Sequence, residues 1–353
     1  MRSLRLDQAK GEEVLAKSIY DEDGRILLRA GTSIRTTYIK KLEEMGIEYI
    51  YIQDEDTEGI QLEDVVSEET RTQGKQEVKR VFKDYIVSER LELTKIYSLV
   101  NTILDEIMNS KEVVLNVSDL RSKNEALYEH CMNVCVLATS VGAYVFDPKK
   151  LKDLTLGAIL HDFGLMFVPE EILDKPDKLS PEEYELIKKH PQTGYDILCV
   201  DPEFSIISRN IVYMHHEKID GSGYPLAVKG KQIHDTTKLV TICDMFDAMV
   251  TPKPYRKQIK IYESFETLAS MAGTQIEPKL WQEFKKRVAL YPVGKGVTLN
   301  NGYRGIVASQ NKDMLSRPIV RILYNDKGIK IPNPYDLDLT QELTLFITDI
   351  IDI

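Results

Sequence analysis

All six histidines of this 353-residue chain lie in its middle, between His130 and His234. The gaps between the first three are regular, because 31 residues separate His130 from His161 and 29 separate His161 from His190. Apolar residues around them recur mostly with a helical period, so each gap corresponds to about one helix hairpin. This spacing predicts a helical bundle in which successive helices bring their histidines to the same end.

Carboxylates accompany these histidines, and together they form a candidate set of metal ligands. Neutral imidazole is the commonest protein ligand for metals, and imidazole with carboxylate but without thiolate suits iron, manganese or zinc. Each histidine alone would more often be a hydrogen-bonded core residue than a ligand. A metal site explains the whole set better than coincidence does. The candidate ligands are His130, His161, Asp162, His190, His215, His216 and Asp244.

Composition limits the class of protein and its compartment. Hydrophobic residues make up 42% and charged residues 29%, as in ordinary globular proteins, and the formal net charge is −10. An acidic chain lacks the broad basic surface through which proteins bind nucleic acids and membranes. The beginning of the sequence has no signal-peptide pattern, no apolar run could span a membrane, and the four cysteines form no CxxC pair. We therefore expect a cytoplasmic protein that binds neither nucleic acid nor membranes.

Residues 1–53 predict a small α+β module. Short apolar runs at 14–16 and 26–28 predict the two strands of a hairpin. The following residues 36–46 have a helical period that ends at a glycine, and an apolar run at 48–52 predicts another strand. No catalytic constellation stands out in this module, so a structural or partner-binding role is the simplest interpretation.

Residues 54–113 predict an acidic linker followed by a long helix. The stretch 54–76 is acidic and polar, whereas apolar residues recur at helical spacing from about 77 to 110. Such a helix either packs on the next domain or pairs with a second copy of the chain. A homodimer through residues 77–110 is therefore one of two interpretations.

Residues 114–290 predict a helical domain, and residues 291–353 predict a β-rich domain with turn signals between short apolar runs. Several of the expected helices carry candidate ligands. One covers 151–164, and another covers 180–198 and begins at Ser180, which is followed by proline as is typical of a helix start. The predicted fold class is mainly α, with a central helical bundle, a small α+β N-terminal module and a β-rich C-terminal extension.

Three motifs, in this order, resemble the HD-GYP subgroup of the HD-domain phosphohydrolases. They are HDFG at 161–164, HHEKIDGSGYP at 215–225 and DMFDAMVTPKPYRK at 244–257. The resemblance covers residues 114–290 and implies an HD-type helical bundle that holds two or three metals, often iron or manganese. It also implies hydrolysis of cyclic di-GMP to pGpG, with or without onward hydrolysis to GMP, in bacterial second-messenger signalling.

The resemblance implies roles for individual residues. The ligands implied for one metal are His130, His161, Asp162 and Asp244. Those implied for a second metal are Asp162, His190, His215 and His216, which places His161 and Asp162 at the catalytic centre. The residues implied to contact the cyclic dinucleotide are Gly221, Gly223, Tyr224 and Pro225 of the GYP loop, with Lys253 and Arg256, whose alternative is solvated surface charge.

Some positions depart from the family pattern. Ala126 stands where family members with a third metal tend to have glutamate, so we expect two divalent metal ions, with Glu217 and Asp247 either supporting the ligands or holding a third. Leu165 replaces the lysine of the HDxGK motif, and losing one charge-stabilising donor can cost a factor of roughly 10²–10³ in rate. We expect a cyclic di-GMP phosphodiesterase. The alternatives are a weak or inactive protein that binds a cyclic dinucleotide or a partner, and a phosphodiesterase for another cyclic dinucleotide.

Overall fold

The computed structural model describes residues 1–353 except 22–24, 63, 111–114, 116–125 and 252–258. The chain divides into two compact units. The terminal unit contains Met1–Asp64, Val114–Ala126 and Lys286–Ile353, and the helical unit contains Val65–Val113 and Leu127–Lys285. The predicted domain limits at 53, 113 and 290 stay predictions.

The first part of the terminal unit is a small sheet with one helix. Its strand order is β1-β5-β2, and a separate two-stranded sheet pairs β3 with β4. Apolar side chains from strand and helix bury one shared core, which includes Leu15, Leu42 and Ile52. The elements are β1 (Arg2–Arg5), β2 (Val14–Leu15), β3 (Ile19–Tyr20), β4 (Ile26–Leu28), α1 (Thr36–Glu44) and β5 (Tyr49–Gln53).

The expected hairpin between 14–16 and 26–28 is wrong in its pairing. β4 pairs with β3, which lies closer to it in the chain and therefore closes a shorter loop. β2 instead pairs with β5, where Leu15 lies opposite Ile52 and both side chains are buried. The expected helix over 36–46 and the strand over 48–52 are both confirmed.

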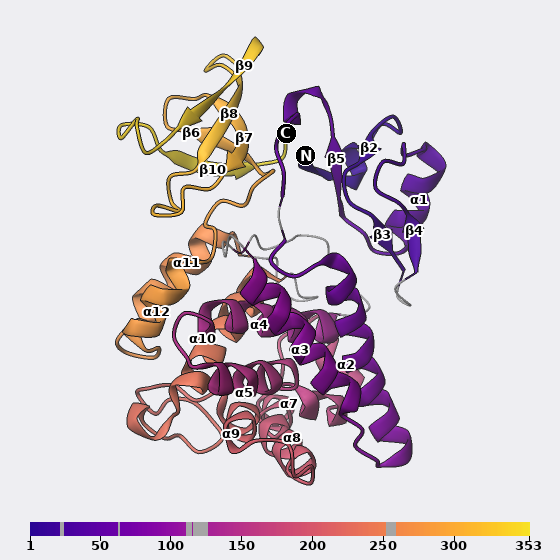
Figure 1. Cartoon of the computed structure of the whole chain (residues 1–353), viewed down its shortest axis with the longest axis vertical. Coiled ribbons are helices and arrows are strands. Elements are labelled where there is room, and N and C mark those ends of the chain that lie inside the picture. Colours follow the sequence, from indigo (N-terminus) through magenta and orange to yellow (C-terminus); the bar gives the residue numbers. More distant parts are fainter. Residues whose placement is uncertain (22–24, 63, 111–114, 116–125, 252–258) are drawn as a thin grey trace. The chain divides into compact units, whose positions relative to one another are not determined.

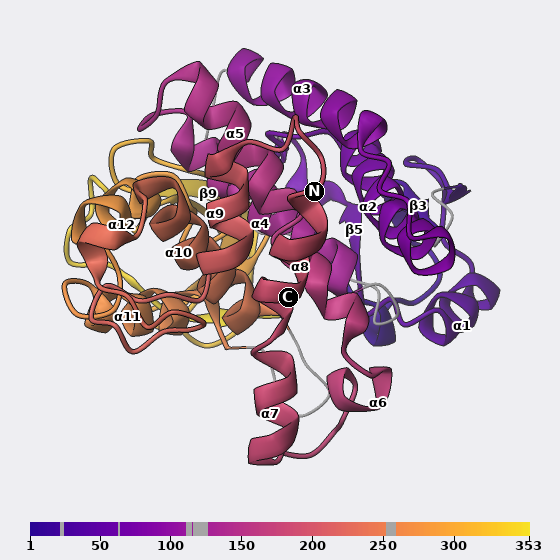
Figure 2. The same ribbon diagram turned by 90° about the horizontal axis from the view of Figure 1, so that it is seen from below.

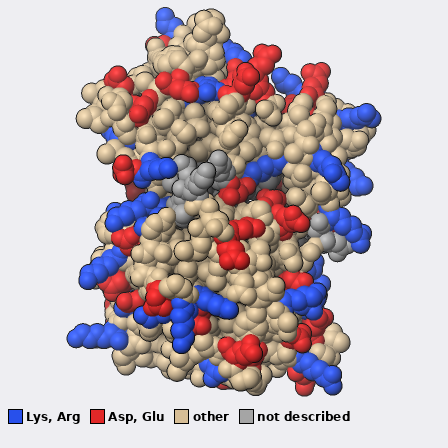
Figure 3. All heavy atoms as spheres, viewed as in Figure 1, with Lys and Arg blue, Asp and Glu red and all other residues tan. Residues whose placement is uncertain are grey.

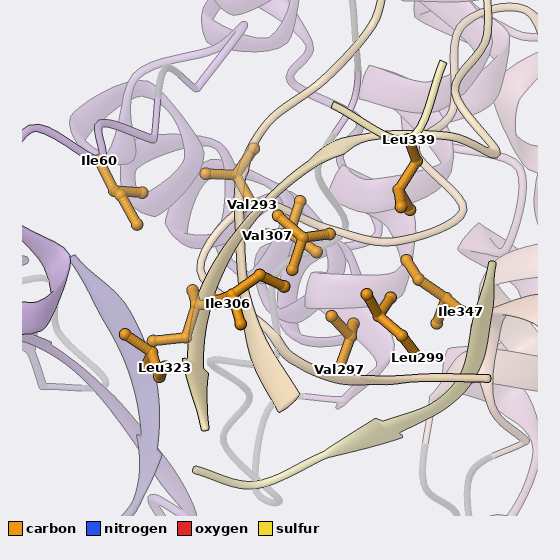
Figure 4. Packing of buried hydrophobic residues seen from close by; sticks show 11 residues of the cluster. Ile60, Val293, Val297, Leu299, Ile306, Val307, Leu323, Leu339 and Ile347 are labelled. Atoms are coloured by element: carbon orange, nitrogen blue, oxygen red, sulfur yellow. The ribbon is translucent and has the colours of Figure 1, made fainter. Parts of the chain in front are cut away.

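The second part of the terminal unit is an antiparallel five-stranded sheet with the order β10-β6-β7-β8-β9. Tight turns at Asn301-Gly302 and at 326–328 join its neighbouring strands, as the sequence predicts. Figure 4 shows its core, in which Ile60 from the first part lies beside the side chains of the sheet. The strands are β6 (Gly296–Leu299), β7 (Arg304–Ser309), β8 (Ile319–Tyr324), β9 (Lys330–Asp338) and β10 (Ile347–Ile351).

Backbone and ion-pair contacts join the two parts of the terminal unit. The N–H of Ser3 donates to the carbonyl of Gly294 at 3.1 Å, and Lys330 Nζ lies 2.8 Å from Asp56 Oδ2. On the face that Figure 3 shows, acidic and basic side chains are interspersed among the described residues.

The helical unit begins with two helices, α2 (Glu68–Ser88) and α3 (Thr94–Asn109), which lie side by side in Figures 1 and 2. The expected single helix over 77–110 is therefore wrong, because Glu89 ends α2 in the left-handed conformation with φ of 52°. The expected linker over 54–76 is also wrong in its second half. Ser67 caps α2 by accepting a hydrogen bond from the N–H of Thr70, so the helix begins before the apolar pattern does. Dimerisation stays a prediction.

Most of the C-terminal part of α4 is buried. α5 and α8 both pack on α9, and α10 packs on α5 and α9. No helix in the described ranges is long and apolar enough to cross a membrane. The helices are α4 (Ala126–Gly142), α5 (Pro148–Ile159), η4 (Phe163–Phe167), α6 (Glu170–Leu173), α7 (Pro181–Ile187), α8 (His190–Leu198), α9 (Ile206–Met214), α10 (Asp235–Val250), α11 (Ile261–Met271) and α12 (Pro278–Lys285).

Two expected helices are interrupted at the candidate ligands. The helix expected over 151–164 ends at Ile159, so His161 and the residue after it leave the regular spiral. The helix expected over 180–198 is split into α7 and α8, and Pro191 allows His190 to begin α8. Its predicted start is confirmed, because Ser180 and Glu183 form a capping box. The predicted fold class, mainly α with β-rich ends, is confirmed.

Candidate metal centre

The carboxylate of Asp162 lies at the centre of four imidazoles. Its Oδ1 is 3.2 Å from Nε2 of His190 and 3.6 Å from Nε2 of His215. Its Oδ2 is 3.3 Å from Nε2 of His161 and 3.6 Å from Nε2 of His130. Each carboxylate oxygen therefore faces a separate pair of histidines.

These residues come from different elements, as the regular spacing predicts. His130 is on α4, the His161-Asp162 pair occupies the turn between α5 and η4, and Asp244 is on α10. His190 is the first residue of α8, and His215 ends α9. The bundle thus brings together ligand candidates that are more than one hundred residues apart in sequence.

The hydrogen bonds of three histidines fix which ring nitrogen carries the proton. The Nδ1 atoms of His161, His190 and His215 lie 2.8, 2.8 and 3.0 Å from the backbone carbonyls three positions earlier. A carbonyl oxygen only accepts, so each Nδ1 is assigned the proton. In the neutral ring each Nε2 then carries a lone pair, and all three lone pairs face the carboxylate of Asp162.

This arrangement fits a metal cation. Nε2 of His190 and Nε2 of His215 are 3.2 Å apart, and two lone pairs at this distance repel unless a cation lies near them. Nε2 of His161 is buried and has no hydrogen-bond partner among the described residues. Buried polar atoms without partners are costly and rare, whereas a metal ion would satisfy all three nitrogens.

Two aspartates on α10 complete the centre. Oδ1 of Asp244 lies 3.1 Å from Nε2 of His130, and its Oδ2 lies 3.6 Å from Nδ1 of His216. Asp247 contacts the other nitrogen of His130, because its Oδ2 lies 2.7 Å from Nδ1. Asp247 therefore orients His130 from behind, as carboxylates commonly do for histidines that bind metals.

Burial and neighbouring charges shift the pKa values of these groups in different directions. Burial lowers the pKa of His215, and it lowers the pKa of His216 more strongly. Burial would raise the pKa of Asp162, but the adjacent His161 and the other surrounding histidines hold it well below its ordinary value. Burial would lower the pKa of His130, yet hydrogen bonds and charges of the two α10 aspartates raise it to about 10. The same carboxylates would attract a metal cation.

The donor atoms fall into two groups that share Asp162. Within each group all donor atoms lie within 4.8 Å of one another. One group is His130, His161 and Asp162, and the other is Asp162, His190, His215 and His216. The second group has the members that the resemblance implies for one metal, whereas the first lacks Asp244, whose Oδ1 lies 3.1 Å from Nε2 of His130.

The GYP loop lies directly against this centre. The ring of Tyr224 stacks on His216, with centroids 4.6 Å apart and an interplanar angle of 24°. Gly221 has φ of +87°, which side chains rarely tolerate, and a Cβ on Gly223 would lie only 2.5 Å from the Cα of Glu217. The two glycines therefore let the loop fold back closely enough to place Tyr224 on a candidate ligand.

Glu217 braces the far side of this loop, a role that the sequence analysis missed. Its buried carboxylate accepts hydrogen bonds from the N–H groups of Leu226, Ala227 and Val228 at 2.6, 3.0 and 3.2 Å. Three backbone donors satisfy a buried charge without any metal. The available signal was a glutamate that directly precedes a glycine-rich turn, where backbone N–H groups need acceptors.

Lys188 lies close to the tyrosine of this loop. Nζ of Lys188 lies 5.8 Å from the centroid of the Tyr224 ring and 5.4 Å from that of Tyr184, and it pairs with Glu185 at 2.6 Å. Leu165 is half-buried within η4.

Lys253 and Arg256, expected to contact the cyclic dinucleotide, lie outside the described residues. His234 is exposed and caps α10 rather than joining the centre. The cysteines of α4 and α10 are buried and free, as expected of packing residues.

Comparison with protein families gives two matches. Residues 115–280 match the family described as HD domain, and residues 296–353 match the KOW domain associated with HD domain. Residues 115–280 therefore form an HD domain. The order of its motifs and its curated relatives place it in the HD-GYP group of that family.

Curated relatives cover different parts of the chain. The cyclic di-GMP phosphodiesterase PA4108 of Pseudomonas aeruginosa is 30% identical over 264 residues, which are 74% of this chain and 63% of that protein. A cyclic di-GMP phosphodiesterase of Thermotoga maritima is 36% identical over 135 residues, which are 38% of this chain and 37% of that protein. The 3′3′-cGAMP-specific phosphodiesterase 3 of Vibrio cholerae is 35% identical over 139 residues, 39% of this chain and 30% of that protein. The chain spans less than two thirds of the length of each.

One solved structure has the same fold over most of the chain. It is Bd1817, an HDG"Y"P protein from Bdellovibrio bacteriovorus, with a TM-score of 0.53 and 21% sequence identity. The match covers 80% of this chain and 97% of that one.

Proposed function

We propose that this protein is a metal-dependent phosphodiesterase that hydrolyses cyclic di-GMP to pGpG. The observation that carries the proposal is the convergence of three histidine Nε2 lone pairs on the two oxygens of Asp162. Relatives named as cyclic di-GMP phosphodiesterases support the same substrate.

We propose two divalent cations, iron or manganese, as the cofactor. Nitrogen and carboxylate donors without sulfur suit these metals. When bound, such cations supply Lewis-acid charge to the oxygens of a phosphodiester. The proposed ligands of one cation are His130, His161, Asp162 and Asp244, and those of the other are Asp162, His190, His215 and His216.

The protein's own groups prepare this site before substrate arrives. The Nδ1–H groups of His161, His190 and His215 donate to backbone carbonyls. These hydrogen bonds hold each imidazole in one orientation, with the lone pair of Nε2 facing inward. The depressed pKa of Asp162 keeps its carboxylate ionised, and each of its oxygens serves one group of ligands. Asp247 holds His130 in place through Nδ1.

We propose that Lys188 supplies positive charge to a substrate phosphate. Leu165 lacks the cation that the family motif carries. Nζ of Lys188 lies 5.8 Å from the centroid of the Tyr224 ring, which stacks on the candidate ligand His216. An ammonium group beside an aromatic ring offers a phosphate and a base complementary surfaces. The residues Tyr224 and Lys188 would then bind the dinucleotide together.

The direct test is an anaerobic assay of the purified chain loaded with iron or manganese. Cyclic di-GMP and 3′3′-cGAMP are supplied separately, and the products are resolved by chromatography as pGpG, GMP or unchanged substrate. Faster hydrolysis of cyclic di-GMP supports the proposal, and faster hydrolysis of 3′3′-cGAMP favours the alternative substrate. Intact cyclic di-GMP in the presence of bound metal contradicts the proposed activity.

A protein that binds cyclic di-GMP but hydrolyses it slowly is the second candidate function. Leu165 is the observation that favours it. Calorimetric binding of cyclic di-GMP without product would support this function. A gain in rate on substituting Leu165→Lys would then show that the missing cation limits the chemistry.

A further inference from the structure

Helix α2 contacts the metal centre's supporting residues although it lies outside the matched HD domain. The HD match covers 115–280, whereas α2 covers Glu68–Ser88. The ring of Phe82 on α2 is almost completely buried, at 1% exposure. It packs edge-on against the ring of Phe163 at 4.8 Å and against that of Tyr128 at 5.7 Å between centroids.

Both partners of Phe82 are close neighbours of proposed ligands. Phe163 directly follows Asp162, and Tyr128 precedes His130 by two positions on α4. One side chain of α2 therefore touches the two segments that bring His130 and Asp162 together. These two ligands belong to the same group of donor atoms, with Nε2 and Oδ2 3.6 Å apart.

Two further contacts extend along the same helix. The ring of Tyr85, nearly one turn after Phe82, packs against Phe163 at 5.7 Å. Earlier on the helix, Gly74 approaches α4 so closely that a Cβ on it would overlap the sulfur of Met132. Met132 follows His130 by two positions, so α2 contacts α4 on both sides of that histidine.

The geometry of an α-helix determines which face of α4 carries Tyr128 and Met132. Residues two positions before and after His130 both lie about 160° around the helix from it. Tyr128 and Met132 are therefore on the face of α4 opposite to the one that presents His130. By packing on that rear face, α2 sets how far His130 reaches toward Asp162.

We propose that Phe82 is a positioning residue of the metal centre and that α2 is a functional part of that centre. The ring of Phe82 contacts both the segment that carries His130 and the segment that carries Asp162, and it thereby keeps the two ligands in a fixed position relative to each other. The proposal rests on the metal site proposed above. It predicts that disturbing Phe82 weakens metal binding beyond any general loss of stability, and that metal binding in turn stabilises α2.

The test uses the full chain freed of metal and then titrated with Mn²⁺ by calorimetry. The variant is Phe82→Leu, which keeps an apolar side chain but removes the ring contacts. Its matched control is Phe204→Leu, because Phe204 has the same 1% exposure and lies in the turn before α9. Thermal unfolding of all metal-free proteins measures the general loss of stability.

We expect Phe82→Leu to raise the Mn²⁺ dissociation constant about tenfold, as loss of support around a ligand typically does. Phe204→Leu should leave that constant within about twofold, even where both variants lose similar thermal stability. If Phe82→Leu does not fold, the half-buried Tyr85→Leu decides, with a smaller rise of the same sign.

A second measurement follows hydrogen exchange of wild-type α2 with and without Mn²⁺. Protection of Glu68–Ser88 should increase on metal binding more than that of α12 (Pro278–Lys285). Equal dissociation constants for wild type, Phe82→Leu and Tyr85→Leu, or equal weakening by Phe204→Leu, would overturn the role of Phe82. Wild-type protein that binds no Mn²⁺, Fe²⁺ or Co²⁺ would instead refute the metal site itself.

Discussion

Oδ2 of Asp247 lies 2.7 Å from Nδ1 of His130, and the opposite nitrogen of the same ring lies 3.1 Å from Asp244. One helix, α10, thus holds both nitrogens of this imidazole, from residues on one helix face. Asp247 is fully buried, so its hydrogen bond to His130 is not shared with bulk water.

The substitution Asp247→Asn should weaken metal binding without removing a ligand. An amide cannot offer His130 the same charged acceptor, so we expect a 10- to 100-fold loss in metal affinity, roughly the range for such supports. Titration with Mn²⁺ measures the effect. The control is Asp105→Asn, an exposed carboxylate on α3 of the same unit. Equal affinities for Asp247→Asn and wild type would show that the aspartate does not support the ligand.

The substitution Glu217→Gln should affect substrate more than metal. It removes the charge that accepts three backbone N–H groups, which we expect to lower the free energy of unfolding by about 2 kcal/mol. With the loop loosened, Tyr224 no longer stays stacked on His216, so KM for cyclic di-GMP should rise while metal content is unchanged. Denaturant unfolding, kinetics and metal analysis check the three parts, with the exposed Glu203→Gln as the control. A variant that loses metal instead would assign Glu217 to the metals.

The substitution Lys188→Ala should lower kcat/KM for cyclic di-GMP by roughly 10- to 150-fold, since a charge-assisted contact to phosphate contributes about 1.5–3 kcal/mol. Lys188→Arg should restore most of the rate because the charge is kept. The neighbouring Lys189 is exposed and offers the control Lys189→Ala. Steady-state kinetics at two salt concentrations provide the measurement. If Lys188→Ala and Lys189→Ala behave alike, the proposed phosphate contact does not exist.

Sequence reasoning identified the ligand candidates because their chemistry is local. A histidine followed by aspartate, a histidine doublet and regular spacing are visible in the letters, and the structure brings these groups within 4.8 Å in two sets. The mainly helical fold and the β-rich end were also predictable, because each follows from the periodicity of apolar residues.

The end of α2 and the residues that support the metal centre and its loop could not be predicted from the sequence, for physical reasons. Periodicity continues across Glu89, but a single left-handed residue ends α2 there. Apolar spacing also cannot reveal that Phe82 meets Phe163, because that contact depends on tertiary packing. The sequence left Glu217 either to support the ligands or to hold a third metal, and only the fold of its loop shows the three N–H groups from which it accepts hydrogen bonds.

Acid should destabilise the terminal unit through Asp54. Burial would raise the pKa of Asp54, but hydrogen bonds from Arg2 and Thr57 hold it below its ordinary value. The ionised form therefore favours the folded state, so its contribution is complete above the ordinary pKa and is lost as pH falls through the depressed one. In an acid titration followed by NMR, Asp54→Asn should make strands β1 and β5 less stable near neutrality. The resonances of these strands should also respond less to acid than in wild type. Unchanged acid sensitivity would contradict this account.

The central claim is that two cations share the carboxylate of Asp162, and counting bound metal per chain tests it most directly. Anaerobically purified wild-type chain, loaded with Mn²⁺ and dialysed, should hold two ions per chain by elemental analysis. The variant His190→Ala should lose one of them, whereas Asp162→Asn should lose both, because both oxygens of that side chain face ligand groups. Wild-type chain without metal, or Asp162→Asn with the wild-type content, would contradict the account.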